Sequence, residues 1–446
     1  MHSIGLYLRD IREGLEFPLQ KVYQNTNIEI ASLRSIEDGE ETPTKEQVLR
    51  LVKFYEVDEQ GVLVHWLSEK WLAEAEGKKI EQQSFGDAAA LVQYGQMISA
   101  FPEIPNLWQI NLESRRYIGN KAKLAMWIRE TLLYNTNGFR ELDTFLDVFA
   151  GTGSIAKNMF GDFRKIIVND ILHANHVIYK AFFLKTDWDK AKVFGILHDY
   201  NSLNPDDLPE NYFSENFGGK FFDAKNAKVI GHIREDLEKR KNELSEKEFS
   251  ILLATLIYNI DKIANTVGHF DAYIKKPIKY KPLRLKAIQP AEYQGIEIHR
   301  EDANDLVRKV KVDIAYIDPP YNSRQYNRFY HIYENLVEWK KPELFGVALK
   351  PQAENNSVYC TVKAKDAFRD LIQNLDAKYI AVSYNNTYNA KSTSSENKIL
   401  LKEIKAILKE KGETKVFECD HSFFNTGKTE FDNHKELLFI TKVNEK

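Results

Sequence analysis

A short sequence near residue 320 combines the residue types needed to hold a flat ring that carries an amino group. Asp318, Pro319, Pro320 and Tyr321 follow directly after the apolar run 312–317. A carboxylate and a prolyl carbonyl accept hydrogen bonds from an NH2 group, tyrosine stacks on a planar ring, and two prolines fix the backbone between them. This arrangement predicts direct methyl transfer to an exocyclic amine. A Pro-rich turn at the end of a strand is the alternative.

A glycine-rich turn supplies a second chemical feature. Gly151 and Gly153 follow an apolar run and precede a helix-forming stretch, so a ligand can approach the backbone there. Asp170 ends the next apolar run, where a carboxylate can bond both ribose hydroxyls. No phosphate-binding loop and no third glycine of a dinucleotide-binding turn are present. The turn therefore favours a nucleoside cofactor without a pyrophosphate, of which S-adenosylmethionine is the common one.

The elements that would position these residues are short apolar runs, typical of buried strands, separated by helix-forming stretches. The runs begin near residues 145, 165, 312, 378 and 435. This alternation predicts an α/β domain with a mostly parallel sheet, a Rossmann-like arrangement.

The alternation is interrupted between the second and third runs, which predicts an inserted subdomain. Its last part, 272–290, holds six basic and no acidic residues, interleaved with Tyr273 and Tyr280. We predict that this segment contacts phosphate groups, and a solvated surface loop is the alternative. The basic residues are Lys275, Lys276, Lys279, Lys281, Arg284 and Lys286.

The first 70 residues carry apolar residues at helical spacing, which predicts four or five short helices. Pro18, Asn27 and Thr44 are predicted helix starts, and Gly39 is a predicted helix stop.

This N-terminal segment resembles the Cro/repressor helix-turn-helix family, most clearly in SLRSIEDGEETPT. The resemblance implies that a helix at about 28–37 would enter the major groove of DNA. Residues 1–70 contain eight basic and thirteen acidic residues, so DNA binding and a packing or dimerisation role both stay open. The expected exposed residues of the helix are Glu29, Ser32, Arg34 and Ser35.

Residues 111–446 resemble the adenine-specific, N6-amino DNA methyltransferases. The glycine turn, the acidic residue and the DPPY sequence occur in that family's order, and RRYIGNKAKL and ANTVGHFDAYIKK add to the resemblance. It implies S-adenosylmethionine as cofactor, double-stranded DNA as substrate, and an adenine flipped out of the duplex.

The resemblance also assigns roles to individual residues. Asp318, Pro319, Pro320 and Tyr321 would hold the target adenine. The residues that would bind the cofactor are Tyr117, Lys121, Asp147, Phe149, Gly151, Gly153, Asp170 and Asp302.

The stretch after Tyr321 is suited to grip the flipped strand by charge and stacking. Arg324 and Arg328 supply the charge. Aromatic side chains are often part of the core. We therefore expect at least two of the aromatic residues in this stretch, which include Tyr326, Tyr330 and His331, to be buried.

The predicted organisation has five parts. They are a helix-turn-helix module at 1–70, a helical connector at 71–110, the cofactor-binding part of a methyltransferase domain at 111–190, an inserted target-recognition subdomain at 191–295, and the catalytic part at 296–446.

The predicted function is site-specific adenine methylation as the modification component of a restriction-modification system, with a cognate endonuclease as a possible partner. An amino-directed methyltransferase acting on RNA or protein is one alternative, and a DNA-binding regulator without catalysis is another. The net charge is −3, and Cys360 and Cys419 are distant, with no CxxC or Cys/His cluster. We therefore expect no disulfide and no metal. Neither a signal peptide nor a membrane span is readable, which favours the cytoplasm.

Overall fold

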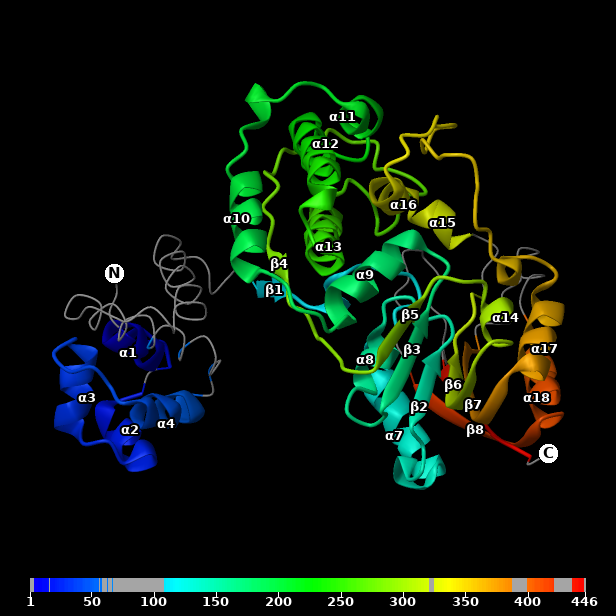
Figure 1. The fold of residues 1–446 in the computed structure, drawn as a ribbon, viewed down its shortest axis with the longest axis horizontal. Helices are drawn as coiled ribbons and strands as arrows, with labels where there is room; N and C mark the ends of the chain where they lie inside the picture. The colour runs from blue at the N-terminus through cyan, green and yellow to red at the C-terminus, as the bar shows by residue number, and fades with distance from the viewer. Residues whose placement is uncertain are drawn as a thin grey trace. The chain divides into compact units, whose positions relative to one another are not determined.

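The structure, a computed structural model, describes residues 4–15, 17–55, 57, 62, 66, 108–320, 325–386, 399–420 and 435–444. It divides into two compact units, Met1–Trp108 and Gln109–Lys446 (Figure 1). Most of the predicted helical connector lies outside the described residues. Its last three residues form strand β1 (Trp108–Ile110), so the prediction of helix is wrong there. Among the described helices, none has the length and apolar character needed to cross a bilayer.

The first unit contains four described helices around an apolar core. They are α1 (Ile4–Gly14), α2 (Leu19–Thr26), α3 (Ile30–Glu37) and α4 (Lys45–Tyr55). Arg12 and Glu37 form a largely buried ion pair, with Nε and Oε1 2.6 Å apart, which joins α1 to α3. The buried core includes Leu8, Val22, Leu33, Ile36 and Val48, at the helical spacing that the sequence showed.

The helix ends of this unit agree with three of the four predicted signals. Pro18 precedes α2, Thr44 and Gln47 cap α4 reciprocally, and Gly39 follows α3 with a φ of 76°. The prediction that Asn27 starts a helix is wrong. Its φ is 54° and its N–H donates to the Tyr23 carbonyl, so it ends α2, because asparagine tolerates the left-handed conformation that closes a helix.

Of the four residues expected to be exposed on α3 and its N-cap, two are exposed. Glu29 and Arg34 are exposed, whereas Ser32 and Ser35 are half-buried. Ser32 Oγ donates to Glu41 Oε2 at 3.1 Å, which accounts for its lower exposure.

The second unit is built on a seven-stranded sheet, in the order β5-β3-β2-β6-β7-β9-β8. The first five strands are parallel and β9 is antiparallel to both neighbours, which confirms the predicted mostly parallel sheet. The strands are β2 (Thr144–Asp147), β3 (Lys165–Asn169), β5 (Ile296–His299), β6 (Lys311–Ile317), β7 (Asp376–Asn385), β8 (Gly412–Asp420) and β9 (Lys435–Val443).

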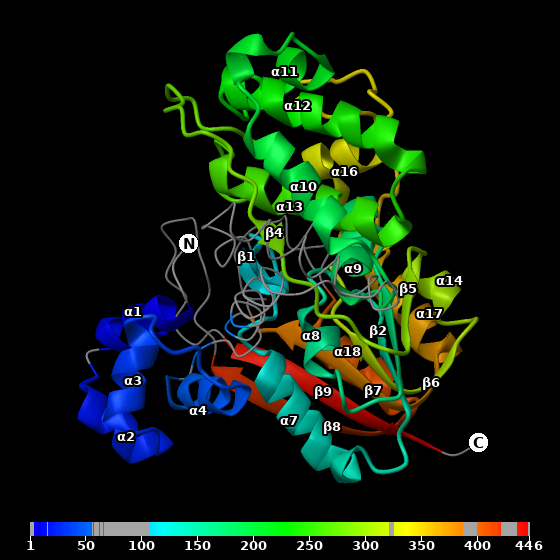
Figure 2. The same ribbon diagram turned by 60° about the vertical axis from the view of Figure 1, so that its left-hand side comes forward.

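Helices cover the sheet and also form a separate group between β3 and β5. Those near the sheet are α7 (Ala125–Asn135), α8 (Ser154–Asn158), α9 (His173–Phe183), α14 (Ala303–Leu306), α15 (Tyr326–Phe329), α16 (His331–Glu338), α17 (Ala364–Asn374) and α18 (Leu401–Lys409). The group between β3 and β5 contains α10 (Lys190–Asn201), α11 (Tyr212–Phe217), α12 (Ala224–Lys239) and α13 (Glu246–Ile263), followed by β4 (Ala287–Ile288), which pairs with β1. Figures 1 and 2 show α10–α13 packed together beyond one end of the strands.

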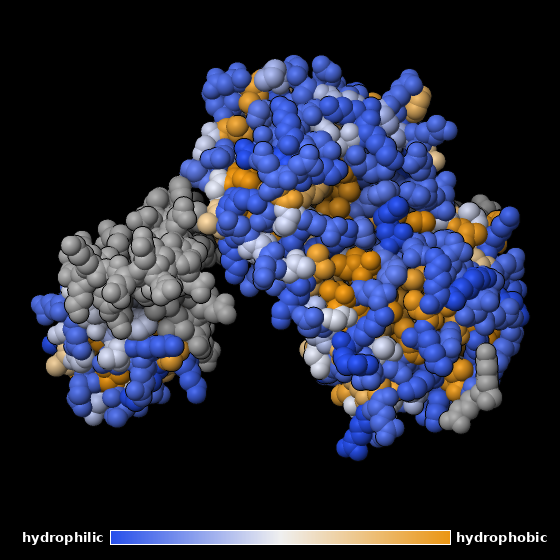
Figure 3. All heavy atoms as spheres, viewed as in Figure 1, coloured by the Kyte–Doolittle hydropathy of each residue, from blue (hydrophilic) through white to orange (hydrophobic). Residues whose placement is uncertain are grey.

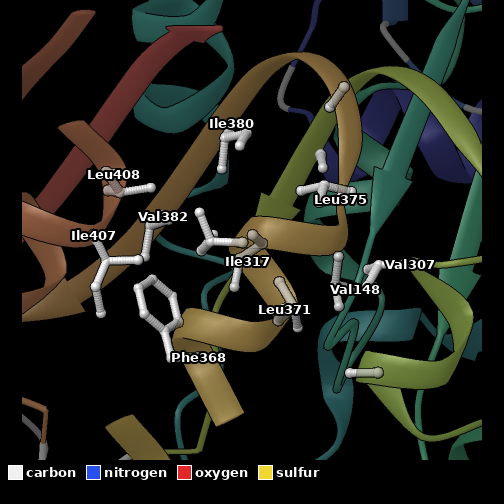
Figure 4. Packing of buried hydrophobic residues seen from close by; sticks show 14 of the residues in the cluster. Val148, Val307, Ile317, Phe368, Leu371, Leu375, Ile380, Val382, Ile407 and Leu408 are labelled. Carbon is white, nitrogen blue, oxygen red and sulfur yellow. The ribbon is translucent and has the colours of Figure 1, made fainter. Parts of the chain in front are cut away.

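One hydrophobic core of the second unit lies between the sheet and the pair α17 and α18. Ile317, Ile380 and Val382 of β6 and β7 face Phe368 and Leu371 of α17 (Figure 4). This packing holds the carboxyl end of β6 in place.

The packing predicts a large stability loss for Phe368→Ala, because the ring is fully buried. We expect the free energy of unfolding to fall by about 3–5 kcal/mol, as for other buried phenylalanines. Urea unfolding would measure it, with the exposed Asp366→Ala on the same helix as a control that should change by less than about 0.5 kcal/mol. Equal losses in the two variants would contradict the packing.

Candidate active site

The carboxyl ends of the central parallel strands meet at one edge of the sheet, where the loops that follow them come together. Register pairs Asp147 of β2 with Tyr316 of β6, and Asp318 follows two residues after Tyr316. Asp170 follows β3 directly and Asp302 lies three residues beyond β5. Residues from four strands thus surround one hollow.

The hollow opens to solvent, and together with the open space at its mouth it measures about 970 Å³. The structure brings together ten of the residues that the sequence predicted for cofactor or adenine. The ten that line it are Tyr117, Lys121, Asp147, Phe149, Gly151, Asp170, Asp302, Asp318, Pro319 and Pro320. Tyr321 lies outside the described residues.

The glycine turn has the backbone that its sequence predicted. Gly151 and Gly153 have φ of 54° and 78°, which favours glycine at both positions. A Cβ at Gly153 would lie 2.9 Å from the Phe183 ring, so Gly153 packs behind the turn while Gly151 lines the hollow. Tyr179 Oη donates to the Gly151 carbonyl at 2.8 Å, which ties the turn to α9.

Asp170 links the turn to the end of β3. Its Oδ2 accepts from the Gly151 N–H at 3.1 Å, and its Oδ1 accepts from the Leu172 N–H at 2.9 Å. Burial raises the pKa of this carboxyl above its ordinary value. The Asn175 side chain also donates to this carboxylate, and the carboxylate lines the hollow, where it can accept a bond from a ligand hydroxyl.

Asp302 caps a helix, as its sequence allowed, and it also lies at the hollow. It caps α14 by accepting from the Asn304 N–H at 2.9 Å, and it also lines the hollow. Nearby, Phe149 and Tyr359 meet edge to face with ring centroids 5.0 Å apart. This end of the hollow can therefore take a flat, polar-edged ring.

Asp318 belongs to a buried charge cluster with a lysine and a glutamate. Lys121 Nζ lies 2.6 Å from Glu436 Oε1 and 3.4 Å from Asp318 Oδ1. Burial raises the pKa of Asp318 to about 7, Lys121 lowers it, and Glu436 raises it. A carboxyl with this pKa at the mouth of a hollow is the kind of group that functional sites contain.

Asp147 is the clearest sign that the hollow takes a charged ligand. Its side chain is buried and lines the hollow, and it has a backbone contact with Ala156 but no side-chain donor among the described residues. Burial and the charge of Asp318 raise its pKa well above the ordinary range. A ligand with an ammonium group would supply the missing donors, and the methionine end of S-adenosylmethionine carries one.

An aromatic cluster holds the segment that carries Tyr117 and Lys121. The rings of Tyr117 and Tyr330 stack with centroids 4.8 Å apart, and Arg115 lies 4.8 Å from the Tyr117 centroid. The Ile118 N–H donates to Tyr330 Oη at 2.8 Å, and Tyr326 Oη donates to the Ile118 carbonyl at 3.3 Å. The residues after the DPPY sequence thus position the side of the hollow formed by Tyr117 and Lys121.

Tyr330→Phe is expected to raise the KM for S-adenosylmethionine by about threefold to tenfold, because one hydrogen bond to the Ile118 amide is lost while the ring stack remains. The kcat at saturating cofactor should change by less than about twofold, since Tyr330 is not among the described residues that line the hollow. Initial-rate kinetics would measure both constants. A fall in kcat with unchanged KM would contradict this role.

Several of the residues expected to contact the flipped strand are buried or already hydrogen-bonded within the protein. Arg324 lies outside the described residues. Arg328 is half-buried and its Nη1 donates to the Pro351 carbonyl at 2.6 Å. Tyr330 and His331 are buried, which confirms that at least two side chains of this stretch belong to the core.

The basic segment is held in place by three asparagines, each of which both accepts from and donates to its backbone. Asn226 bonds Lys281 and Leu283, Asn201 bonds Leu285 through both its N–H and its carbonyl, and Asn259 bonds Lys286. Because the backbone is satisfied from α10, α12 and α13, the basic side chains point outward. All six are exposed: Lys275, Lys276, Lys279, Lys281, Arg284 and Lys286.

Two residues near the site were missed by sequence reasoning. Glu436 reaches Lys121 because β9 pairs with β7, where its register partner is Asn385. Tyr359 lines the hollow from the short 3-10 turn Val358–Cys360, whose sequence gives no signal. Tyr326, which belongs to the stretch predicted to grip the flipped strand, lines the hollow from the start of α15. Among the described residues, no group of three or more His, Cys, Asp or Glu could hold a metal. Cys360 is buried and Cys419 is half-buried.

A mostly parallel sheet with a hollow at its carboxyl edge is the arrangement of a Rossmann-like ligand-binding domain. The chain belongs to the D12 class N6 adenine-specific DNA methyltransferase family, whose model matches residues 117–389. The family predicted from the sequence is therefore confirmed.

Three relatives show how far the similarity extends. The chain is 33% identical to Type II methyltransferase M.FokI of Planomicrobium okeanokoites, covering 67% of this chain and 47% of that protein. It is 35% identical to Modification methylase StsI of Streptococcus sanguinis, covering 61% and 44%. It is 29% identical to Type II methyltransferase M.NlaIII of Neisseria lactamica, covering 72% and 95%. The chain thus spans about half of the first two relatives and nearly all of the third.

Proposed function

We propose that the chain transfers a methyl group from S-adenosylmethionine to the N6 amino group of adenine at a short sequence in double-stranded DNA. The observation that carries this proposal is Asp318, which lies half-buried after the end of β6, lines the same hollow as the glycine turn and pairs with Lys121. The relatives are named as type II or modification methyltransferases, which supports a role as the modification component of a restriction-modification system.

The reaction needs an acceptor that holds the amino group and orients its lone pair. The Asp318 carboxylate accepts one N–H, and the Pro319 carbonyl is the second acceptor at the same rigid strand end. As the new bond forms, positive charge develops on the amino nitrogen, and the carboxylate stabilises that charge within a buried site. Tyr321 supplies a ring for stacking on the flipped adenine.

The hollow fits S-adenosylmethionine by the chemistry of its donors and acceptors. Asp147 would take the ammonium group, Asp170 the ribose hydroxyls and Asp302 the adenine edge, beside Phe149. When bound, the cofactor supplies an electrophilic methyl group on a sulfonium. Tyr117 and Lys121 would close the methionine end, and Gly151 and Gly153 keep the turn low enough for the ligand to approach.

DNA would contact the outer face of α10–α13 and the loops around the hollow. The six exposed bases of 275–286 would bind phosphates, and Arg324 and Arg328 would lie nearer the flipped nucleotide. We assign 191–295 as the target-recognition subdomain, between the cofactor part at 111–190 and the catalytic part at 296–446.

The N-terminal unit has the helix pair that a helix-turn-helix needs. Helices α2 and α3 are separated by three residues and closed by Asn27 in the left-handed conformation. We assign this unit as a Cro-like module, with Arg34 exposed on the reading helix.

One experiment tests the activity and the DNA sequence together. The purified protein would be incubated with unmethylated genomic DNA and S-adenosylmethionine, and modified adenines would be mapped at single-base resolution. Methylation of one short sequence by the wild type, absent with Asp318→Ala, is the expected result. Absence of transfer to DNA with the cofactor still bound would contradict the proposal and direct the search to RNA, protein or regulation.

A further inference from the structure

Two loops near the candidate active site expose large apolar side chains. Phe345 is 53% exposed and Val347 is 73% exposed in the hairpin 345–350, and Val267 is 55% exposed in the loop after α13. The loop between α16 and α17 extends beyond α16 (Figure 1), and apolar side chains lie among polar ones at its tip (Figure 3). Apolar side chains gathered in exposed loops mark interaction sites.

The hairpin adjoins the hollow that would take the flipped adenine. Phe345 lines a second hollow whose walls include Asn327 and Asn355, and these two residues also line the candidate active site. The apolar tip therefore lies next to the place where a base leaves the duplex.

The hairpin is held rigidly against the segment that follows the DPPY sequence. Its backbone closes through two bonds between Phe345 and Lys350, at 2.8 and 3.0 Å. Lys350 forms an ion pair with Asp271, and Arg328 of α15 donates to the Pro351 carbonyl. A rigid support is what an inserted side chain requires, because a mobile one would yield to the base stack.

The loop of Val267 is anchored to the same helix. The Phe270 N–H donates to the Phe329 carbonyl at 2.8 Å, and the rings of His269 and Phe329 have centroids 5.0 Å apart. Both apolar loops thus take their position from α15, which begins six residues after Pro320.

We propose that Phe345 and Val347 form an apolar wedge that enters the DNA base stack and fills the space left by the flipped adenine, with Val267 exposed on the adjoining loop. The inference rests on the proposed function. Flipping a base costs a few kcal/mol in lost stacking and pairing, and apolar side chains inserted between base steps offset part of that cost.

The test compares two duplexes that contain the mapped recognition sequence. In one the target adenine is paired with thymine, and in the other it faces an abasic site, where flipping is easier. We expect the double variant Phe345→Ala/Val347→Ala to methylate the paired duplex about 10- to 100-fold more slowly than the wild type, and the unpaired duplex within about threefold of it. Fluorescence of 2-aminopurine at the target position would report the flipped population, which should fall in the variant.

Tyr134→Ala is the matched control, because this side chain is 87% exposed on α7, at the opposite end of the unit from the hairpin in both views (Figures 1 and 2). It should leave both rates unchanged. A double variant as active as the wild type on the paired duplex would contradict the wedge, as would an equal loss on both duplexes. A wild type that methylates neither duplex would contradict the proposed function itself.

Discussion

Replacing Asp318 with alanine is expected to slow methyl transfer by about 10²- to 10³-fold, the cost of removing one preorganised group at a reacting centre. The carboxylate accepts an N–H of the target and stabilises the charge that develops on its nitrogen. Alanine provides neither, and it leaves the Lys121 ammonium without one of its two carboxylate neighbours. Single-turnover kinetics with saturating cofactor would isolate this step.

Asp318→Asn separates the geometric from the electrostatic part of that effect. Asparagine keeps one acceptor oxygen but carries no charge, so its rate should fall between those of the wild type and Asp318→Ala. Because nothing titrates at this position in the variant, its rate should be independent of pH around 7. Affinity for S-adenosylmethionine, measured by calorimetry, should stay within about threefold in both variants, since Asp147 and Asp170 are untouched. An alanine variant as fast as the wild type would exclude Asp318 as the acceptor.

The strands that carry the site could be predicted because each is a short apolar run that ends in a turn residue. β2, β3, β6, β7 and β9 all fall where such runs occur. β5 and β8 were missed because both lie at the edges of the sheet. Ile296–His299 is half-buried throughout, so isoleucine alternates with Glu and His in this strand and no continuous apolar run marks it.

The site could be predicted where a residue acts from its own loop, and not where it depends on strand pairing. Asp170 and Asp318 follow their own strands, so local sequence places them at the edge. Glu436 lies 315 residues from Lys121 along the chain, and only the antiparallel return of β9 beside β7 brings its carboxylate to the cluster. Asn27 shows the same limit on a smaller scale, because an asparagine at a helix boundary can begin one helix or end another.

The charge cluster predicts that methyl transfer increases with pH through about 7, because burial raises the pKa of Asp318 to about that value. Below this pH the carboxyl is protonated and becomes a weaker acceptor, so kcat/KM for DNA should fall. Lys121 lowers the pKa of Asp318 and Glu436 raises it, so removing them should move the profile in opposite directions.

Lys121→Met should raise the pKa of Asp318 and reduce kcat/KM at pH 7 by about tenfold or more, with recovery at higher pH. Glu436→Gln should lower the pKa, so that activity persists at a more acidic pH than in the wild type. Profiles of kcat/KM between pH 5.5 and 9 would be recorded at saturating cofactor, because Lys121 also lines the cofactor side of the hollow. Shifts of both variants in the same direction would show that the two side chains act by holding the local structure, whereas opposite shifts would establish that they set the charge of Asp318.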